Sequence, residues 1–158
     1  MPRPVYIVCS ESGAEDTLTR LLSLFNVIEK IQIKNLPSAP PPGERLLVPT
    51  LTIRTTAVWM KTENDVPDQE YEFQTVFCFP PDGRETVIQE GRLFFNADMP
   101  FARLATIVTS PPFPGPGLFR VLNRIRRVGT QEWLAQDYPI VIEREPAPAS
   151  DASTGTQS

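Results

Sequence analysis

Apolar and polar residues alternate with a period of two along much of this chain, and the pattern is clearest in residues 71–79. Such alternation is typical of a β-strand with one buried face, because successive side chains of a strand point to opposite sides of its sheet. The turn sequence "PPDG" follows at 80–83, where proline fixes one φ angle and Gly83 can adopt a positive one. A second run occupies 84–96, so the pattern predicts a β-hairpin over 71–96.

Shorter runs of strand character lie between clusters of proline and glycine. Proline supplies 18 of the 158 residues, against a typical share of about 5%, and such clusters mark loops and interrupt helices. The further predicted strands are 5–10, 51–60, 102–110, 118–126 and 137–145. The chain is therefore predicted to be all-β, a two-sheet antiparallel β-sandwich of about seven to eight strands, immunoglobulin-like or C2-like.

The composition indicates one domain. A hydrophobic share of 41% and a charged share of 22% fit a globular domain that buries its own core, and we assign residues 1–145 to it. The last residues, 146–158, contain no large apolar side chain and are predicted to be a disordered polar tail, because burial would not offset the entropy lost on ordering them. The residues predicted to be buried, at alternating strand positions, are Leu51, Ile53, Phe73, Phe77, Ile107 and Ile140.

Residues 18–33 fit two patterns. Apolar residues recur at helical spacing, which would give an amphipathic helix from Thr17 to about Glu29. The second half of the segment also alternates as a strand would and is rich in β-branched residues, which favour strands. Of the two interpretations we expect the strand, and the helix remains the alternative.

The net charge of the chain bears on which functions are compatible with the sequence. The formal net charge is −4 and the isoelectric point is near 4.9, which argues against a general nucleic-acid binder, because neutralising phosphates requires an excess of Lys and Arg. The amino-terminal apolar run is too short for a signal peptide, and no stretch approaches the roughly 20 apolar residues that cross a bilayer. We expect a cytoplasmic protein with neither nucleic acid nor membrane as a partner.

Histidine is absent from the sequence. Its absence excludes a Ser-His-Asp triad, a Cys-His pair and any metal site with an imidazole ligand. Cys9 and Cys78 are too few for a disulfide framework and too far apart for a C-x-x-C site, so we expect two buried free thiols. The sequence predicts a protein that is not an enzyme and that has no metal and no cofactor.

The main candidate for a binding site is a group of basic residues. Arg120, Arg124 and Arg126 would project from one face of the strand 118–126, as recognition of a carboxylate or another anion requires. Two structural interpretations compete with this one: a polar outer sheet face, and an edge strand whose charges prevent pairing with another chain. Trp133, in a polar stretch, is expected to be partly exposed and could add a stacking surface.

Other candidates are weaker. The acidic group in "KTENDVPDQEYE" could chelate Ca²⁺, but it lacks the spacing of a dedicated loop, so a solvated hairpin loop is the better interpretation. Its members are Glu63, Asp65, Asp68, Glu70 and Glu72. Asp82 and Glu85 could pair as glycosidase carboxylates, but hydrogen bonding to the turn backbone explains an aspartate at this position. Trp59 is expected in the core.

The order of several segments resembles a known family. The segments are "VCSESG", "LLSLFNVIEKI", "VPTLTIRTTAVW", the hairpin through "PPDG", "FPGPGLFRVLNRI" and "YPIVIE". Together they resemble a family of small bacterial β-sandwich proteins of unknown function. The shared steps are a P-x-P-G sequence before the penultimate strand and a proline near the start of the last one, here Pro114, Pro116, Gly117 and Pro139. The resemblance implies that 18–33 is extended, in the place of a strand beside 4–9, and it implies no activity and no catalytic residues.

Two function classes follow from these observations. We expect a non-enzymatic β-sandwich protein that binds a protein partner or acts as a structural module, and the sequence leaves both the partner and a homo-oligomer open. The alternative is a ligand-binding module for a sugar or small anion that uses Trp133 and the arginine-bearing face.

Overall fold

The computed structural model describes residues 1–16, 22–34, 46–47, 51–65, 69–95, 100–113 and 115–145. Eleven β-strands and no helix lie within these residues, which confirms the predicted all-β fold. Accordingly, the described part of the chain contains no helix with the length and hydrophobicity needed to span a membrane. The predicted tail at 146–158 lies outside the described residues.

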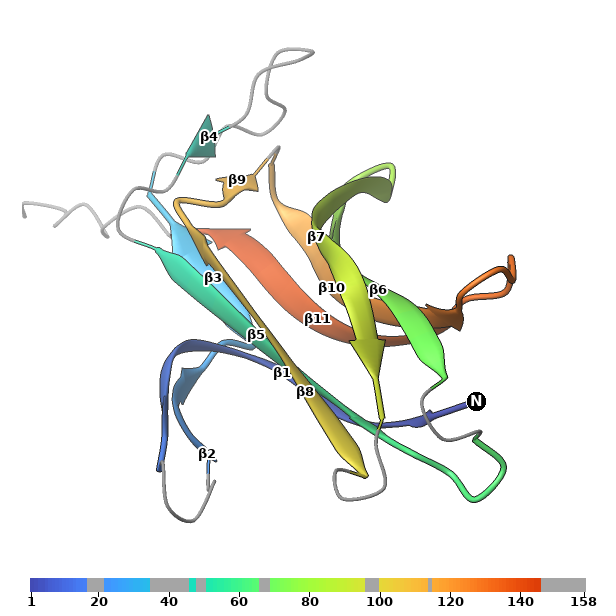
Figure 1. Ribbon diagram of the computed structural model, residues 1–158. Helices are drawn as coiled ribbons and strands as arrows, with labels where there is room; N and C mark the ends of the chain where they lie inside the picture. Colours follow the sequence, from blue (N-terminus) through green and yellow to red (C-terminus); the bar gives the residue numbers. More distant parts are fainter. Residues whose placement is uncertain are drawn as a thin grey trace, which may run out of the picture.

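Nine of the strands form two sheets that pack face to face (Figure 1). The four-stranded sheet, in the order β2-β1-β5-β8, consists of β1 (Arg3–Glu15), β2 (Leu22–Val27), β5 (Thr52–Met60) and β8 (Phe101–Thr109). The five-stranded sheet, in the order β3-β11-β10-β6-β7, consists of β3 (Lys30–Ile33), β6 (Glu70–Phe79), β7 (Arg84–Phe94), β10 (Gly117–Arg127) and β11 (Leu134–Arg144). The short strands β4 (Leu46–Leu47) and β9 (Pro112–Phe113) pair with each other. The predicted two-sheet sandwich is confirmed, with nine strands in place of seven or eight.

Residues 18–33, which fit both a helical and a strand pattern, are extended in the part that the structure describes. Residues 22–27 and 30–33 form strands, so the strand prediction is confirmed there, and 17–21 lie outside the described residues. The segment divides at Ile28: β2 pairs antiparallel with β1, and β3 pairs parallel with β11. Ile28 is buried, and its N–H donates to the carbonyl of Cys9 at 2.9 Å. Because the chain crosses between the sheets here, one parallel pair departs from the predicted antiparallel pairing.

Strand β1 is longer than predicted and has a different partner at each end. Residues 3–10 pair with β5, and residues 10–15 pair with β2. The expectation that β2 would lie beside 4–9 is therefore wrong. The physical reason is that "SGAE" continues the strand instead of connecting two strands, and β1 curves away from the five-stranded sheet as it does so (Figure 1). Residues 11–15 and β2 together are called the arm below.

The predicted hairpin over 71–96 is confirmed as β6 and β7. Gly83 has φ of +69°, the positive value that the turn was expected to need, and its N–H donates to the carbonyl of Phe79 at 2.9 Å. The Asp82 side chain accepts a hydrogen bond from the backbone N–H of Arg84. This contact explains the aspartate by turn formation, as expected.

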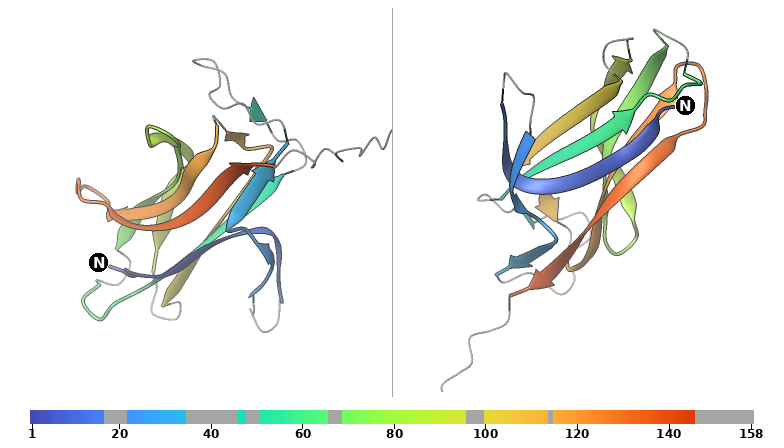
Figure 2. Two further views of the ribbon diagram at one scale, coloured as in Figure 1. Left: turned by 180° about the vertical axis from the view of Figure 1, so that it is seen from behind. Right: turned by 90° about the horizontal axis from the view of Figure 1, so that it is seen from below.

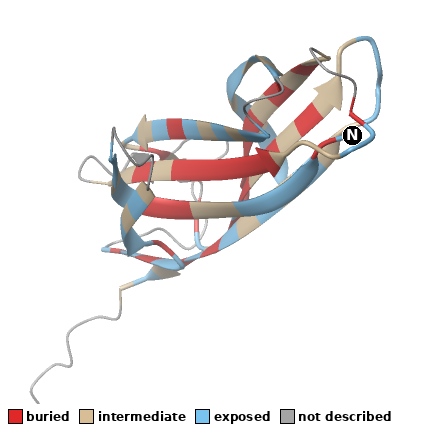
Figure 3. Ribbon diagram, turned by 60° about the horizontal axis from the view of Figure 1, so that its bottom comes forward, coloured by how far each residue is buried: buried red, intermediate tan, exposed pale blue. Residues whose placement is uncertain are grey.

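The core lies between the sheets, and buried residues alternate with more exposed ones along parts of the strands (Figure 3). Two apolar clusters make up the core. The larger contains Ile53, Phe77, Phe119 and Ile140 among others, and the smaller contains Trp59, Tyr71, Phe73, Phe95 and Ile125. The predicted burial is confirmed for Ile53, Phe73, Phe77 and Ile140, and Leu51 is partly buried against the larger cluster.

The predicted burial of Ile107 is wrong. Its side chain is 59% exposed on the outer face of β8. The inward positions of this strand belong to Ala102, Leu104, Thr106 and Val108. Both faces of β8 carry apolar residues, so the alternation shows that there are two faces without showing which of them is buried.

A chain of hydrogen bonds crosses the core between the two clusters. The Trp59 indole N–H donates to Asn123 at 2.6 Å, and the Asn123 amide donates to Thr75 at 3.1 Å. The Thr75 hydroxyl lies 2.9 Å from that of Thr106, which donates to the side chain of Gln89. A bulge in β7 lies next to Gln89. Because buried polar groups need their partners, this chain fixes the position of one sheet on the other.

Candidate functional site

The predicted arginine-bearing face is the outer face of the five-stranded sheet. Arg120, Arg124 and Arg126 alternate on β10 with buried residues, so they point outward together, as predicted. However, β10 lies between β11 and β6 in the middle of the sheet. The interpretation that these arginines protect an edge strand is therefore wrong, and the interpretation of a polar outer sheet face agrees with the structure.

Each of these arginines already has a carboxylate partner on another strand of the same sheet: Asp137 on β11, Glu85 on β7 and Glu72 on β6. The ion pairs are Arg120–Asp137 at 2.9 Å, Arg124–Glu85 at 3.1 Å and Arg126–Glu72 at 2.6 Å. The Arg124 guanidinium also donates to the side chain of Gln74 at 3.0 Å. Within the sheet, the repulsion between the three positive charges is thus already relieved.

Trp133 precedes β11 on the same face and is partly exposed, as predicted, whereas Trp59 is fully buried, as predicted. The guanidinium carbon of Arg126 lies 4.5 Å from the ring centroid of Trp133, and that of Arg124 lies 5.1 Å from it. These are cation–π distances. At least one face of the indole is therefore covered by the protein itself, which makes the ring less suited to stacking on a sugar.

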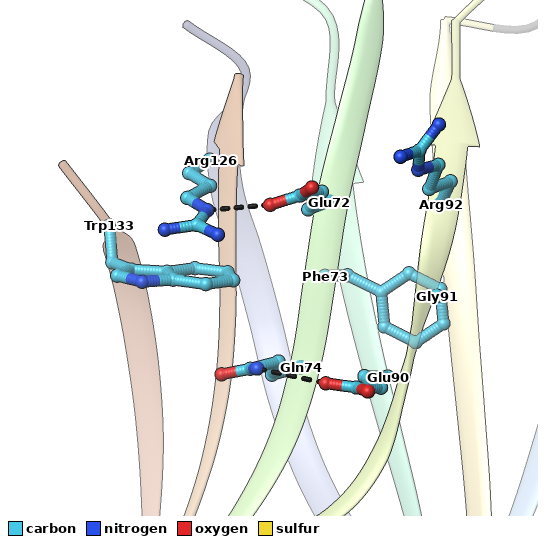
Figure 4. A pocket seen from close by; sticks show the side chains of 8 residues that line it. All are labelled: Glu72, Phe73, Gln74, Glu90, Gly91, Arg92, Arg126 and Trp133. Atoms are coloured by element: carbon cyan, nitrogen blue, oxygen red, sulfur yellow. Dashed lines mark hydrogen bonds and ion pairs between the residues drawn. The ribbon is translucent and has the colours of Figure 1, made fainter. Parts of the chain in front are cut away.

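A hollow of about 250 Å³ lies beside Trp133 on this face (Figure 4). Its lining residues are Glu72, Phe73, Gln74, Glu90, Gly91, Arg92, Arg126 and Trp133. The two carboxylates and two guanidinium groups of the lining cancel in formal charge. Glu72 accepts from Arg126 at 2.6 Å, and Glu90 accepts from Gln74 at 3.1 Å. The hollow therefore does not have the excess positive charge that an anion site requires.

The acidic group between β5 and β6 does not converge on one point. Glu70 and Glu72 pair with arginines on different strands, and Asp68 lies outside the described residues. In the part of the chain that the structure describes, no three acidic or thiol side chains are grouped as metal ligands would be.

Asp65 departs from the prediction of a solvated loop, because its side chain is buried. It accepts hydrogen bonds from the Tyr71 hydroxyl at 2.9 Å and from the N–H and hydroxyl of Thr62, both at 2.8 Å. The amino group of Met1 lies 2.8 Å from the same carboxylate. Burial by itself raises the pKa of Asp65, but these contacts outweigh it and lower the pKa to about 2. Asp65 thus anchors the loop to β6.

Both cysteines are free and buried, as predicted. Cys9 belongs to the core of the sandwich, whereas Cys78 alternates with inward residues and so faces outward from β6. Burial raises the pKa of Cys9 to about 12, although a hydrogen bond with Thr55 acts in the opposite direction, and burial also raises the pKa of Cys78. Both thiols are protonated at neutral pH, so neither is activated as a nucleophile.

A second surface, which the sequence patterns did not identify, is the outer face of the four-stranded sheet. Tyr6, Phe101 and Ile107 are 42%, 54% and 59% exposed there. The strand register places Phe101 beside Met60, and Tyr6 beside Val58. Apolar pairs therefore join β8 to β5 at one place and β5 to β1 at another, and arginines lie opposite Met60, Val58 and Ile107. The charged residues on β5, β8 and the part of β1 that pairs with β5 are Arg3, Arg54 and Arg103, with no carboxylate among them.

The arm touches part of this face. Glu15 of the arm pairs with Arg103 of β8 at 3.1 Å, and the Gly13 carbonyl accepts a hydrogen bond from Arg54 at 3.4 Å. Thr56 of β5 alternates with the inward residues Thr55 and Ala57, so its side chain points to the outer face, and yet it is buried. The middle of this face is therefore covered. The apolar residues of β8 lie at the open side of the face.

The edge strands β7 and β8 belong to different sheets and lie on the same side of the sandwich, where Thr106 and Gln89 meet (Figure 2). Strand β7 carries the charged residues Arg84, Glu85, Glu90 and Arg92, together with a bulge. Strand β8 carries one charged residue, Arg103. A high apolar content with one charge in nine residues was the sequence signal for this surface, but edge position depends on the sheet order, which the sequence does not show.

Neither a protein-family model nor a curated protein matches this chain. The fold and geometry define a two-sheet β-sandwich: the charged residues on one outer face pair with each other, and the other outer face carries exposed apolar residues and arginines. Membership of the bacterial family that the sequence resembles stays a prediction.

Proposed function

We propose that this protein is a non-enzymatic protein-interaction module that binds its partner through the outer face of the four-stranded sheet. The observation that carries the proposal is the exposure of Phe101 and Ile107 on an edge strand with one charged residue. Exposed aromatic and aliphatic side chains on an edge strand favour protein binding, because covering them removes apolar surface from water. The arginines near them supply the polar rim that such interfaces have.

The arginine-bearing face supports this function less well. An acidic partner there would compete with carboxylates that already pair with Arg120 and Arg126. Displacing those carboxylates leaves them without their partners, and this cost reduces the gain from the new contact.

The hollow beside Trp133 supports a second candidate function, the binding of an uncharged sugar. Its carboxylates, amide and guanidinium groups are suitable hydrogen-bonding groups for hydroxyls. Titration with a panel of glycans and small anions, followed by tryptophan fluorescence, separates the two candidates. Since Trp59 is buried in the core, a change on adding ligand reports mainly on Trp133. We expect no saturable change, and a saturable one would favour the second candidate.

Cross-linking from two matched positions tests the proposal. A photoreactive residue replaces Ile107 in one variant and Val87 in the other. Both are exposed β-branched residues on edge strands, but they belong to different sheets. After irradiation in the cells that produce the protein, we expect covalent protein adducts from position 107 and few from position 87. Adducts from position 87 with none from position 107 would contradict the proposal.

A further inference from the structure

The backbone of β8 has one side directed away from its sheet. At the two ends of the β5–β8 pair, the Ser110 N–H donates to the carbonyl of Leu51, and the Lys61 N–H donates to that of Pro100. The register between these ends is regular and antiparallel. Because alternate residues of an antiparallel strand bond to the same neighbour, the even-numbered residues of β8 bond to β5. The odd-numbered residues, from Phe101 to Thr109, direct their N–H and C=O groups away from β5.

Strand β8 is the edge strand with the fewest features that prevent pairing. Charges, prolines, bulges and short length are the usual ones. Strand β7 has four charged residues and a bulge, β3 has only four residues, and β2 contains Asn26 with a positive φ of 55°. Strand β8 has nine residues, one charge, no proline and a regular register. Its outer edge therefore fits an added strand better than the other edges do.

We infer that the strand added at this edge is β8 of a second copy of the chain, in antiparallel orientation. The inference rests on the proposed function and names its partner. Two identical antiparallel strands are related by a two-fold axis, so the assembly closes at two copies. Both four-stranded sheets then join into one continuous sheet with four strands from each copy.

One register makes the two β8 strands complementary. When Leu104 lies opposite Leu104 of the second copy, the outward residue Phe101 lies opposite Ile107 of that copy, and Ala105 lies opposite Arg103. All of these outward pairs join odd-numbered residues, whose backbone groups are directed toward the new strand. An aromatic residue opposite a β-branched one stabilises a sheet, and the apolar side chains of Phe101 and Ile107 become covered.

The adjacent registers are less favourable. A shift of two residues in one direction puts the two Arg103 side chains opposite each other, which is destabilising for like charges. A shift of two residues in the other direction replaces the pair of Phe101 and Ile107 by one of Phe101 and Thr109. A shift of one residue directs the outward face of one strand toward the inward face of the other. The charge of Arg103 is also reduced within each copy by its ion pair with Glu15.

Sedimentation equilibrium of the purified full chain tests the inference, with two matched charge variants. The wild type is expected to approach twice its chain mass of 17.7 kDa as its concentration rises, over a range of about 1 to 200 µM in which weak dimers form. Ile107→Lys should remain monomeric over the same range, because it places a charge on the edge. Val87→Lys makes the same change on β7 and should behave as the wild type does.

Two results would overturn the inference: a monomeric wild type at the highest concentration, or equal dimerisation of both variants. A monomeric wild type together with adducts from position 107 to a different protein would leave the proposed function in place and refute the second copy as the partner. Lack of any adduct from position 107 would refute the proposed function itself.

A cysteine scan tests the register. Leu104→Cys places two thiols opposite each other across the two-fold axis and should give a covalent dimer on mild oxidation. Ala102→Cys should give much less, because position 102 lies opposite position 106 in this register. The native thiols interfere little, since both are buried and protonated. Far-UV circular dichroism checks that both variants are folded, and a covalent dimer from Ala102→Cys alone would overturn the register.

Discussion

The outer faces of the two sheets differ in whether their side chains are already paired. On the five-stranded sheet, carboxylates and guanidinium groups from four adjacent strands form ion pairs with each other. The exposed apolar residues on its strands are Val87, Phe94, Leu118 and Val141. On the four-stranded sheet, exposed apolar residues lie beside arginines on β1, β5 and β8, and Glu15 of the arm pairs with one of these arginines, Arg103.

The difference between the two faces shows that pairing within a sheet can by itself account for a concentration of charge on its surface. The strand register explains why the charges of this face pair with each other: Glu72 lies opposite Arg92 on one side and Arg126 on the other. Cross-strand pairs of opposite charge stabilise the sheet that carries them. The apolar face gains from being covered, because its side chains have no such partners in water.

The largest predicted effect is on the free energy of unfolding. It should be large for a residue between the two sheets and small for one on the outer face proposed for binding. Phe77 is fully buried between the sheets and stacks edge-on against Phe119 at a centroid distance of 4.9 Å. Phe77→Ala should lower the free energy of unfolding by about 3–5 kcal/mol, and Ile107→Ala should change it by less than about 0.5 kcal/mol. Urea denaturation of dilute protein measures both. Equal losses would show that Ile107 belongs to the core after all.

The second prediction concerns the hydrogen-bond chain that fixes one sheet on the other. Asn123→Ala removes the acceptor for the Trp59 indole and one partner of Thr75. We expect the free energy of unfolding to fall by about 3 kcal/mol, the upper end of the range for an unsatisfied buried polar group, because two hydrogen-bond partners are affected. The same denaturation experiment measures the loss, with Gln131→Ala at an exposed loop position as the control. A loss no larger than that of the control would mean that the chain does not join the sheets.

The third prediction contrasts a buried carboxylate with the exposed ones of the charged face. The pKa of Asp65 in the folded protein, about 2, lies below its ordinary value of 3.8. The stability it contributes is therefore complete above about pH 4 and is lost as the pH falls through 2, with a total of about 2 kcal/mol. Unfolding measured between pH 5 and pH 2 for the wild type and Asp65→Asn checks this. If the variant loses as much stability on acidification as the wild type, Asp65 is not the group responsible.

These structural features differ in how far the sequence predicts them. The alternation in 71–79 and the "PPDG" turn were sufficient for the central hairpin, because both are local signals. The outward direction of Arg120, Arg124 and Arg126 was predicted for the same reason. Their carboxylate partners were not, because Glu72, Glu85 and Asp137 become neighbours only through the order of the strands in the sheet.

The features that carry the proposed function depend on the same order. Among the residues that the structure describes, β8 is an edge because no other strand joins the four-stranded sheet beyond it, which is a matter of topology and not of local pattern. The direction of Ile107 depended on which of two similar faces met the other sheet. The split of 22–33 between two sheets likewise follows from tertiary pairing, which overrides local propensity.

The smallest predicted effect tests whether the charged face is held by its own ion pairs. Both side chains of the Glu72–Arg126 pair are partly exposed, so the coupling between them should be only about 0.5–1 kcal/mol and should fall as salt is added. A double-mutant cycle with Glu72→Gln and Arg126→Gln measures it. A coupling of zero at low salt would mean that Arg126 is available to a partner, and the comparison between the two faces would weaken.

Amide hydrogen exchange, read residue by residue by NMR, tests most directly whether β8 is the binding edge. In dilute protein, the amides of the odd-numbered residues of β8 should exchange faster than those of the even-numbered residues, which bond to β5. At high concentration, or with a bound partner, we expect the odd-numbered amides from Phe101 to Ile107 to become protected while those of β7 do not change. Protection that appears instead around Arg124 and Trp133, with β8 unchanged, would contradict it.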